Sequence, residues 1–239
     1  MTKYGTFNAS LTQCQGTRIT YDHENVQILD HSILPLLLSR LRDPKCNTKD
    51  FRDTSDRIMQ LLIEEAIGQE PKKVSKRVSL TGGEYDHYEL AYPTEDYCAI
   101  TIIRAGDSML HKVFDLMPGI SVGKVLVQRD EESPDKHPIF YYSKLPKKIA
   151  EKKRIFILDP MLGTGGSCKC VISKLLEAGV EEKNITFINL ISCPEGLDAL
   201  TSAHPSMKII TAVLDPKMND NRYITPGLGD FGDRYFNSN

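Results

Sequence analysis

The sequence predicts an α/β fold, a mostly parallel twisted sheet flanked by helices. From Tyr97 onward, short apolar segments of strand length alternate with stretches of helical periodicity. This alternation is typical of parallel sheets, because two parallel strands need a long crossover connection between them, usually a helix. Ligands of such folds bind at the carboxyl ends of the strands. We treat the chain, residues 1–239, as a single domain.

The N-terminal part has a different texture. Residues 1–25 are mostly polar, and we expect them to form a mobile arm. Residues 33–42 and 48–67 carry apolar side chains at helical spacing, which predicts two helices. A passage rich in Gly, Lys and Pro, 68–83, then interrupts the pattern. We therefore expect an N-terminal helical arm with a boundary in that passage.

Five apolar segments are the expected strands, with one clear helix among them. The strands are residues 100–103, 122–127, 155–158, 185–191 and 209–214. The helix, 167–177, has apolar residues at positions i, i+3, i+4, i+7 and i+8. Gly179 suits the left-handed residue that often follows the end of a helix.

Composition and charge exclude several classes of protein. The hydrophobic share of 40% and the charged share of 26% are ordinary for a soluble chain. A net charge of −2 gives no basic excess, so we expect no nucleic-acid partner. We expect neither a signal peptide nor a membrane span, because the start is polar and no run of about 18 apolar residues exists. Scattered cysteines without a Cys-x-x-Cys pair favour reduced thiols and a cytoplasmic location.

The most informative segment is the phosphate loop, Asp159–Ser167. A buried strand leads into a turn with three glycines, and the turn opens a helix. Glycines let the backbone approach an anion, and amides at the helix start can hold a phosphate together with the Thr164 and Ser167 hydroxyls. Asp159 would repel a phosphate that it touched, but it would accept hydrogen bonds from sugar hydroxyls nearby. The pattern therefore predicts a sugar-phosphate site.

Three other nucleotide sites compete with this interpretation. A nucleoside-triphosphate loop needs a lysine before Ser167, and none is present. A dinucleotide fold places its glycines after the first strand, whereas this loop lies past the middle of the chain. Some adenosylmethionine-dependent methylases have a similar loop. They usually also carry an Asn/Asp-Pro-Pro-aromatic motif, and this chain has no Pro-Pro pair, which weakens that alternative.

From about residue 25 to its end, the chain resembles the uracil phosphoribosyltransferases. The segments that carry the resemblance are Leu158–Ser167, Ile103–Gly106, residues 128–132 with 140–146, and Tyr223–Arg234. The resemblance implies the phosphoribosyltransferase type of fold, with a flexible hood hairpin over 129–146 and a uracil-binding segment over 223–234. It implies that uracil and phosphoribosyl pyrophosphate, the donor, give UMP and pyrophosphate. Gly163 stands where members commonly have Ala, and the hood is a few residues longer.

The same resemblance assigns contacts residue by residue. For the donor it implies Arg104, Arg129, Asp159, Pro160, Met161, Leu162, Gly163, Thr164, Gly165, Gly166, Ser167 and Asp230, and for uracil Ile224, Gly229, Asp230 and Phe231. The two arginines would neutralise the leaving pyrophosphate, and Asp230 would reach the ribose or magnesium. No side chain is assigned as a general base.

Mg²⁺ is the expected cofactor. We expect it to arrive on the donor's oxygens, so no protein metal ligand is assigned. Family members form dimers or tetramers and some are activated by GTP, so the resemblance implies a homodimer or homotetramer and admits a GTP effector. A non-catalytic sensor of the donor or of UMP, with the same fold, is the alternative hypothesis. Intact Arg104, Arg129, Asp159, Thr164 and Asp230 favour the enzyme.

Overall fold

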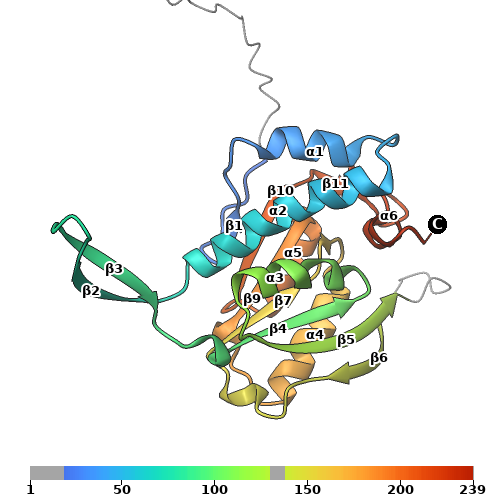
Figure 1. Ribbon diagram of the computed structural model, residues 1–239. Helices are drawn as coiled ribbons and strands as arrows, with labels where there is room; N and C mark the ends of the chain where they lie inside the picture. Colours follow the sequence, from blue (N-terminus) through green and yellow to red (C-terminus); the bar gives the residue numbers. More distant parts are fainter. Residues whose placement is uncertain (1–18, 130–137, 239) are drawn as a thin grey trace, which may run out of the picture.

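The computed structural model describes residues 19–129 and 138–238 (Figure 1). Its central sheet has eight strands: β1 (Val26–Ile28), β4 (Tyr97–Ile103), β5 (Ser121–Arg129), β6 (Pro138–Lys144), β7 (Arg154–Leu158), β8 (Met161–Leu162), β9 (Ile185–Ser192) and β10 (Lys208–Leu214). They lie in the order β1-β10-β9-β7-β4-β5-β6, and β8 pairs with β9. Every pair is parallel except β5 with β6. The predicted mostly parallel sheet is confirmed.

The five strands expected from the sequence are β4, β5, β7, β9 and β10. All eight residues of β9 are buried, as are six of the seven residues of β4. A strand that is covered on both faces has a continuous apolar run and no alternation of polar with apolar residues. This is why short uninterrupted runs marked these strands in the sequence.

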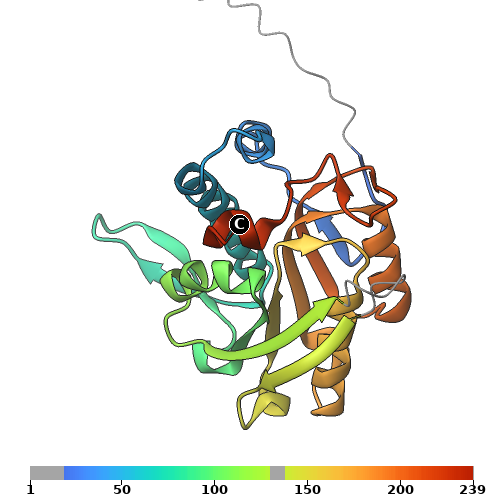
Figure 2. The same ribbon diagram turned by 90° about the vertical axis from the view of Figure 1, so that its right-hand side faces the viewer.

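Helices cover both faces of the sheet (Figures 1 and 2). The helices are α1 (Leu34–Arg42), α2 (Thr48–Gly68), α3 (Leu110–Leu116), α4 (Gly166–Glu177), α5 (Pro194–Ala203) and α6 (Phe231–Phe236), with 3₁₀ turns η1 (Thr94–Asp96), η2 (Ala105–Met109), η3 (Ile149–Glu151) and η4 (Glu182–Asn184). One hydrophobic core joins α1, α2, α3 and α6 to the sheet, and a second joins α4 and α5 to the opposite face. This double covering is the architecture that places ligands at the carboxyl edge of the sheet.

The two N-terminal helices belong to the body of the fold. Asn47 caps α2, with its side-chain oxygen 2.9 Å from the Asp50 amide that donates to it. Phe51, Ile58 and Leu62 of α2 are fully buried against the sheet and its neighbours. The expectation of a separate N-terminal helical arm is therefore wrong, because the apolar face of α2 is a main part of one core.

Residues 68–83 were expected only to interrupt the helical pattern. In the structure they include the first strand of a β-hairpin. Its strands, β2 (Lys72–Val78) and β3 (Glu84–Leu90), pair antiparallel and project away from the body (Figure 1). Every residue of β2 is exposed, so no alternation of apolar and polar residues signals a strand. Cross-strand ion pairs such as Lys76–Asp86, at 2.7 Å, join the two strands.

Strands β5 and β6 pair antiparallel, with a register shift between Leu126 and Val127. The expected hood, 129–146, contains Arg129 of β5 and all of β6, and its role as a hood stays a prediction. Its connection, residues 130–137, and residues 1–18 of the expected N-terminal arm lie outside the described residues. A second small pair, β11 (Lys217–Met218) with β12 (Ile224–Thr225), lies in the C-terminal region. Within the described part of the chain, no helix has both the length and the apolar character needed to cross a membrane.

Candidate functional site

The candidate site lies along the carboxyl edge of the sheet. Strands β4, β7, β9 and β10 lie side by side and run parallel. Their last residues therefore share one edge of the sheet. Arg104 follows β4, Asp159 follows β7, Cys193 follows β9 and Asp215 follows β10. Residues far apart in the sequence are thus collected along one edge.

The first half of the phosphate loop is fixed to strand β9. The Pro160 carbonyl accepts hydrogen bonds from the amides of Leu190 and Ile191, both at 3.0 Å. The Leu162 carbonyl accepts one from the Cys193 amide at 3.2 Å, and the Leu162 side chain is only 1% exposed. Leu162 therefore holds the loop by packing in the core, and only its backbone can face a ligand.

The second half of the loop turns into helix α4. Gly165 precedes the helix with a φ of 76°, a left-handed conformation that favours glycine. The Thr164 hydroxyl accepts a hydrogen bond from the Gly166 amide at 3.4 Å. Residues 161–168 and Asp159 line a small hollow of about 30 Å³ at this point. The positive end of the α4 dipole faces this turn, which favours an anion.

Helix α5 packs against the phosphate loop, a contact that was not predicted from the sequence. A Cβ atom on Gly196 would come within 2.3 Å of the Gly163 carbonyl oxygen and 2.8 Å of Leu162 Cγ. The buried Cys193 thiol lies 3.3 Å from the same oxygen, and burial raises its pKa to about 12. Only a glycine in the first turn of α5 permits this close approach. A glycine near a helix start was the available signal.

Arg104 turns from the end of β4 onto helix α6. Its Nη2 lies 2.5 Å from Asp233 Oδ1, and its Nη1 donates to the Ser238 hydroxyl. The guanidinium carbon is 6.0 Å from the centre of the Phe236 ring. The hydrogen bond from Arg104 lowers the pKa of Asp233 below its ordinary value. The structure thus joins the segment after β4 to the end of the expected uracil-binding segment.

The turn after Arg104 is itself held by an acid that sequence reasoning did not identify. Asp107 Oδ1 accepts a hydrogen bond from the Thr101 hydroxyl at 2.7 Å. Its other oxygen is 2.8 Å from Lys124 Nζ on strand β5. These contacts fix the path of η2 relative to β4 and β5.

Two side chains of the expected uracil-binding segment are buried in the core. Phe231 is 1% exposed, and its ring lies 5.2 Å from that of Phe51 and 5.6 Å from that of Tyr235. Ile224 is also buried. Asp230 caps α6, and its Oδ1 accepts a hydrogen bond from the Asp233 amide at 2.9 Å. The side chains of Ile224 and Phe231 therefore anchor the segment in the core.

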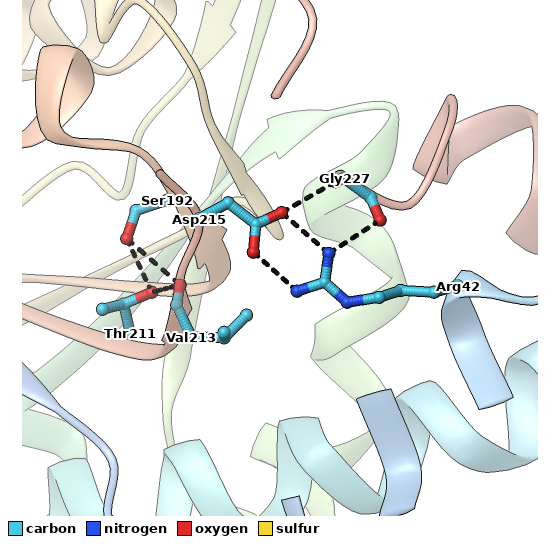
Figure 3. A network of polar contacts seen from close by, with 6 residues as sticks. All are labelled: Arg42, Ser192, Thr211, Val213, Asp215 and Gly227. Atoms are coloured by element: carbon cyan, nitrogen blue, oxygen red, sulfur yellow. Dashed lines mark hydrogen bonds and ion pairs between the residues drawn. The ribbon is translucent and has the colours of Figure 1, made fainter. Parts of the chain in front are cut away.

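A buried ion pair holds this segment to helix α1 (Figure 3). Arg42 contacts both carboxylate oxygens of Asp215, at 2.6 and 2.9 Å, and Asp215 is 2% exposed. Asp215 also accepts a hydrogen bond from the Gly227 amide at 2.7 Å, while Arg42 donates to the Gly227 carbonyl at 3.3 Å. Three chain segments therefore meet at one carboxylate.

Strand β9 supports Asp215 from behind. The Asp215 amide donates to the Ser192 carbonyl at 2.8 Å. The Ser192 and Thr211 hydroxyls are 3.0 Å apart, and Thr211 donates to Asn189 at 2.7 Å (Figure 3 shows the first of these bonds). Asp215 was missed, although an acid directly after a buried strand is the signal that marked Asp159.

Arg234 fixes the segment from its other end. It donates to the carbonyls of Leu41 and Leu228, both at 2.6 Å, and to that of Asp43 at 3.1 Å. Its guanidinium carbon lies 4.2 Å above the centre of the Phe51 ring. Because a planar guanidinium offers five donors, one side chain can join the end of α1 to the uracil-binding segment.

Arg129 is the last residue of β5, and the placement of its side chain is outside the described part. Its cross-strand neighbour is Pro138. Pro138 Cδ would lie 3.3 Å from a Cβ atom on Gly166, so the base of the hood adjoins the phosphate loop.

A separate cavity of about 460 Å³ lies between α1 and the ends of β1 and β10. Arg42, Asp215 and Pro226 form part of its wall, but no residue of the phosphate loop does. We place the candidate chemistry at the glycine turn, where amides and hydroxyls converge.

Replacing Gly196 by alanine should disturb the phosphate loop. The added methyl group has no room beside the Gly163 carbonyl, and overpacking of this kind costs about 1–3 kcal/mol. Denaturant unfolding should show that loss of stability. Gly68→Ala is the matched control, because a Cβ atom added there would have no other atom within 4 Å. Equal stability of the two variants would contradict the close approach.

Replacing Asp215 by asparagine should loosen the segment around Gly227. The amide keeps an acceptor for Gly227 but leaves Arg42 without its counter-charge, which costs about 1–3 kcal/mol. Hydrogen exchange should show faster exchange of the Gly227 amide. The exposed pair Lys49–Asp53 supplies the control, since Asp53→Asn should change neither stability nor exchange. Unchanged exchange of the Gly227 amide in Asp215→Asn would show that the Arg42–Asp215 ion pair does not hold this segment.

Comparison with known proteins shows which family this chain resembles. A family model described as uracil phosphoribosyltransferase matches residues 28–238. A uracil phosphoribosyltransferase of Dictyostelium discoideum is 41% identical over 214 residues, 89% of this chain and 96% of its own. One of Saccharomyces cerevisiae is 39% identical over 200 residues, covering 84% and 90%.

Among solved structures, the AQ2163 protein from Aquifex aeolicus covers 89% of this chain and 98% of its own. The TM-score is 0.75 at 27% identity. The resemblance noted in the sequence is thereby confirmed over nearly the whole chain. With its phosphate loop and C-terminal segment on one sheet edge, the chain belongs to the uracil phosphoribosyltransferase family.

Proposed function

We propose that this protein is a uracil phosphoribosyltransferase of pyrimidine salvage. The bond between the ribose anomeric carbon and pyrophosphate breaks, a bond from that carbon to uracil N1 forms, and the N1 proton is released to solvent. The observation that carries the proposal is that the acid and glycine turn, 159–167, lies at the same sheet edge as Arg104 and Asp215, which contact segment 223–234. A sugar phosphate and a base can meet there.

The donor is assigned to the phosphate loop and two arginines. Gly163, Thr164, Gly165, Gly166 and Ser167 bind the 5-phosphate, and Asp159, with the backbone of 160–162, faces the ribose. Arg104 and Arg129 neutralise the leaving pyrophosphate, since a guanidinium suits bidentate contacts with phosphate oxygens. Positioning and charge stabilisation then supply the catalysis, with no covalent intermediate.

Mg²⁺ enters with the donor in this proposal. Magnesium prefers oxygen ligands and retains several waters, so a few carboxylates and the donor's phosphates suffice. Asp230, exposed at the start of α6, has suitable chemistry for this and for the ribose. Mg²⁺ held in this way would supply positive charge to offset the charge that develops on pyrophosphate.

The backbone of Ile224 and of Gly229, Asp230 and Phe231 reads the base. Uracil presents a carbonyl acceptor and a ring N–H donor where cytosine presents the reverse. A fixed main-chain donor and acceptor therefore discriminate between them, since each unsatisfied buried group costs about 1–3 kcal/mol. The buried rings around Phe231 support this role by fixing the main chain. We assign no general base.

The expected assembly and location are part of the same proposal. The β2–β3 hairpin exposes Val74, Val78, Leu80 and Tyr88, and exposed apolar groups of this kind mark protein contacts. This supports a homodimer or homotetramer. We also propose a cytoplasmic enzyme without a nucleic-acid or membrane partner, and GTP as an effector to be tested.

The activity assay is direct. Radiolabelled uracil, phosphoribosyl pyrophosphate and Mg²⁺ should give labelled UMP, separated by anion exchange. Omitting the donor provides the blank. Binding of the donor without any UMP at high protein concentration would instead identify a sensor and reject the proposal.

Asp159→Asn should reduce kcat/KM for the donor about 10- to 100-fold, because a hydrogen bond from ribose to a charged acceptor is weakened. Steady-state kinetics with the donor varied measures this change. The exposed Asp53→Asn on α2 is the control and should behave like the wild type. Wild-type kinetics in Asp159→Asn would remove the ribose role of Asp159.

A further inference from the structure

We propose that Asp233 is the positioning residue for Arg104, holding its guanidinium toward the pyrophosphate of the donor. This inference rests on the proposed function, because it concerns how the same site recognises its leaving group. Asp233 lies within segment 223–234, but no contact with the donor or the base is assigned to it above. It enters through its contacts with Arg104 and Asp230.

The contacts form a small closed set of three side chains, from the first turn of α6, the residues after its end and the residue after β4. Asp233 Oδ1 lies 2.5 Å from Arg104 Nη2 and also accepts a hydrogen bond from the Ser238 hydroxyl at 3.0 Å. Ser238 in turn accepts from Arg104 Nη1. Each of the three side chains therefore contacts the other two. Such a triangle fixes the direction of a long side chain better than one ion pair does.

The shape of α6 admits the guanidinium. A Cβ atom on Gly232 would lie 3.2 Å from Arg104 Nη2 and 3.4 Å from Asp230 Oδ1. The guanidinium and the Asp230 carboxylate thus both lie beside the space that a side chain at position 232 would occupy. A larger residue at position 232 would press on both groups.

Asp233 also joins the two proposed donor contacts. Its side chain holds Arg104, and its amide donates to Asp230 Oδ1 at 2.9 Å. Asp233 thereby sets the spacing between the Arg104 guanidinium, assigned to pyrophosphate, and the Asp230 carboxylate, assigned to the ribose or magnesium. Correct spacing matters because both groups must meet one donor molecule at once.

Arg104 remains able to bind phosphate in this arrangement. Its side chain is 48% exposed. The contacts with Asp233 and Ser238 use two of the five guanidinium donors. An arginine that is already ordered loses less side-chain entropy when a ligand binds than a free one does. Asp233 therefore increases affinity for the donor by ordering Arg104, which outweighs the partial offset of its charge.

Asp233→Asn tests this directly, since it keeps an acceptor of the same shape and removes the charge. We expect KM for the donor to rise about fivefold, with kcat and KM for uracil within twofold. The melting temperature should not change, because the pair lies on the surface. Ser238→Ala should have a smaller effect in the same direction. A lower KM for the donor would overturn the inference, because Asp233 would then compete with pyrophosphate for Arg104.

A double-mutant cycle separates positioning from a general structural role. In an Arg104→Ala background, Asp233→Asn should have no further effect on KM for the donor. An equal effect in both backgrounds would overturn the inference. Calorimetric Kd values for phosphoribosyl pyrophosphate provide the same cycle independently of turnover. If the wild type formed no UMP, the proposed function would fail, and the Kd cycle would still decide the role of Asp233.

Discussion

The attachment of the phosphate loop to strand β9 is the constraint on which the site depends. The carbonyls of Pro160 and Leu162 accept hydrogen bonds from amides of β9 and of the residue after it. The turn that follows therefore starts from a fixed point. Helix α5 begins at the end of the same strand and lies against Gly163 through Gly196. The glycine turn therefore has rigid support on two sides, which a site that works by positioning would require.

Two acids after buried strands have opposite surroundings. Asp159 stands at the mouth of the glycine turn, whereas Asp215 is buried with Arg42 as its counter-charge. In the sequence both are an Asp that follows an apolar run and precedes a proline. Their immediate neighbours are alike, and the ion pair of Asp215 with Arg42, 173 residues away, cannot be read from them. Prediction from sequence found the first because a glycine-rich turn follows it.

The strands and the phosphate loop were predictable because their signals are local, namely continuous apolar runs and glycines beside a helix start. The other elements depend on contacts that short-range patterns do not carry. The hairpin β2–β3 is exposed on most of its surface, and its few apolar residues are mixed with charged ones, so no continuous apolar run marks its strands in the sequence. The clamps formed by Arg42, Arg234 and Asp233 each join segments that the sequence separates widely. Their residue types were visible, but their partners were not.

The burial of Phe231 has a consequence for how this chain can diverge. If the atoms that read the base are main-chain atoms, exchanging the side chains around them leaves the reading surface in place. Point substitutions would then shift base preference only weakly, whereas inserting or deleting one residue between 224 and 231 would shift every reading atom. On the proposed assignment, selectivity would be a property of chain length and path, and it would persist while the sequence around it drifts.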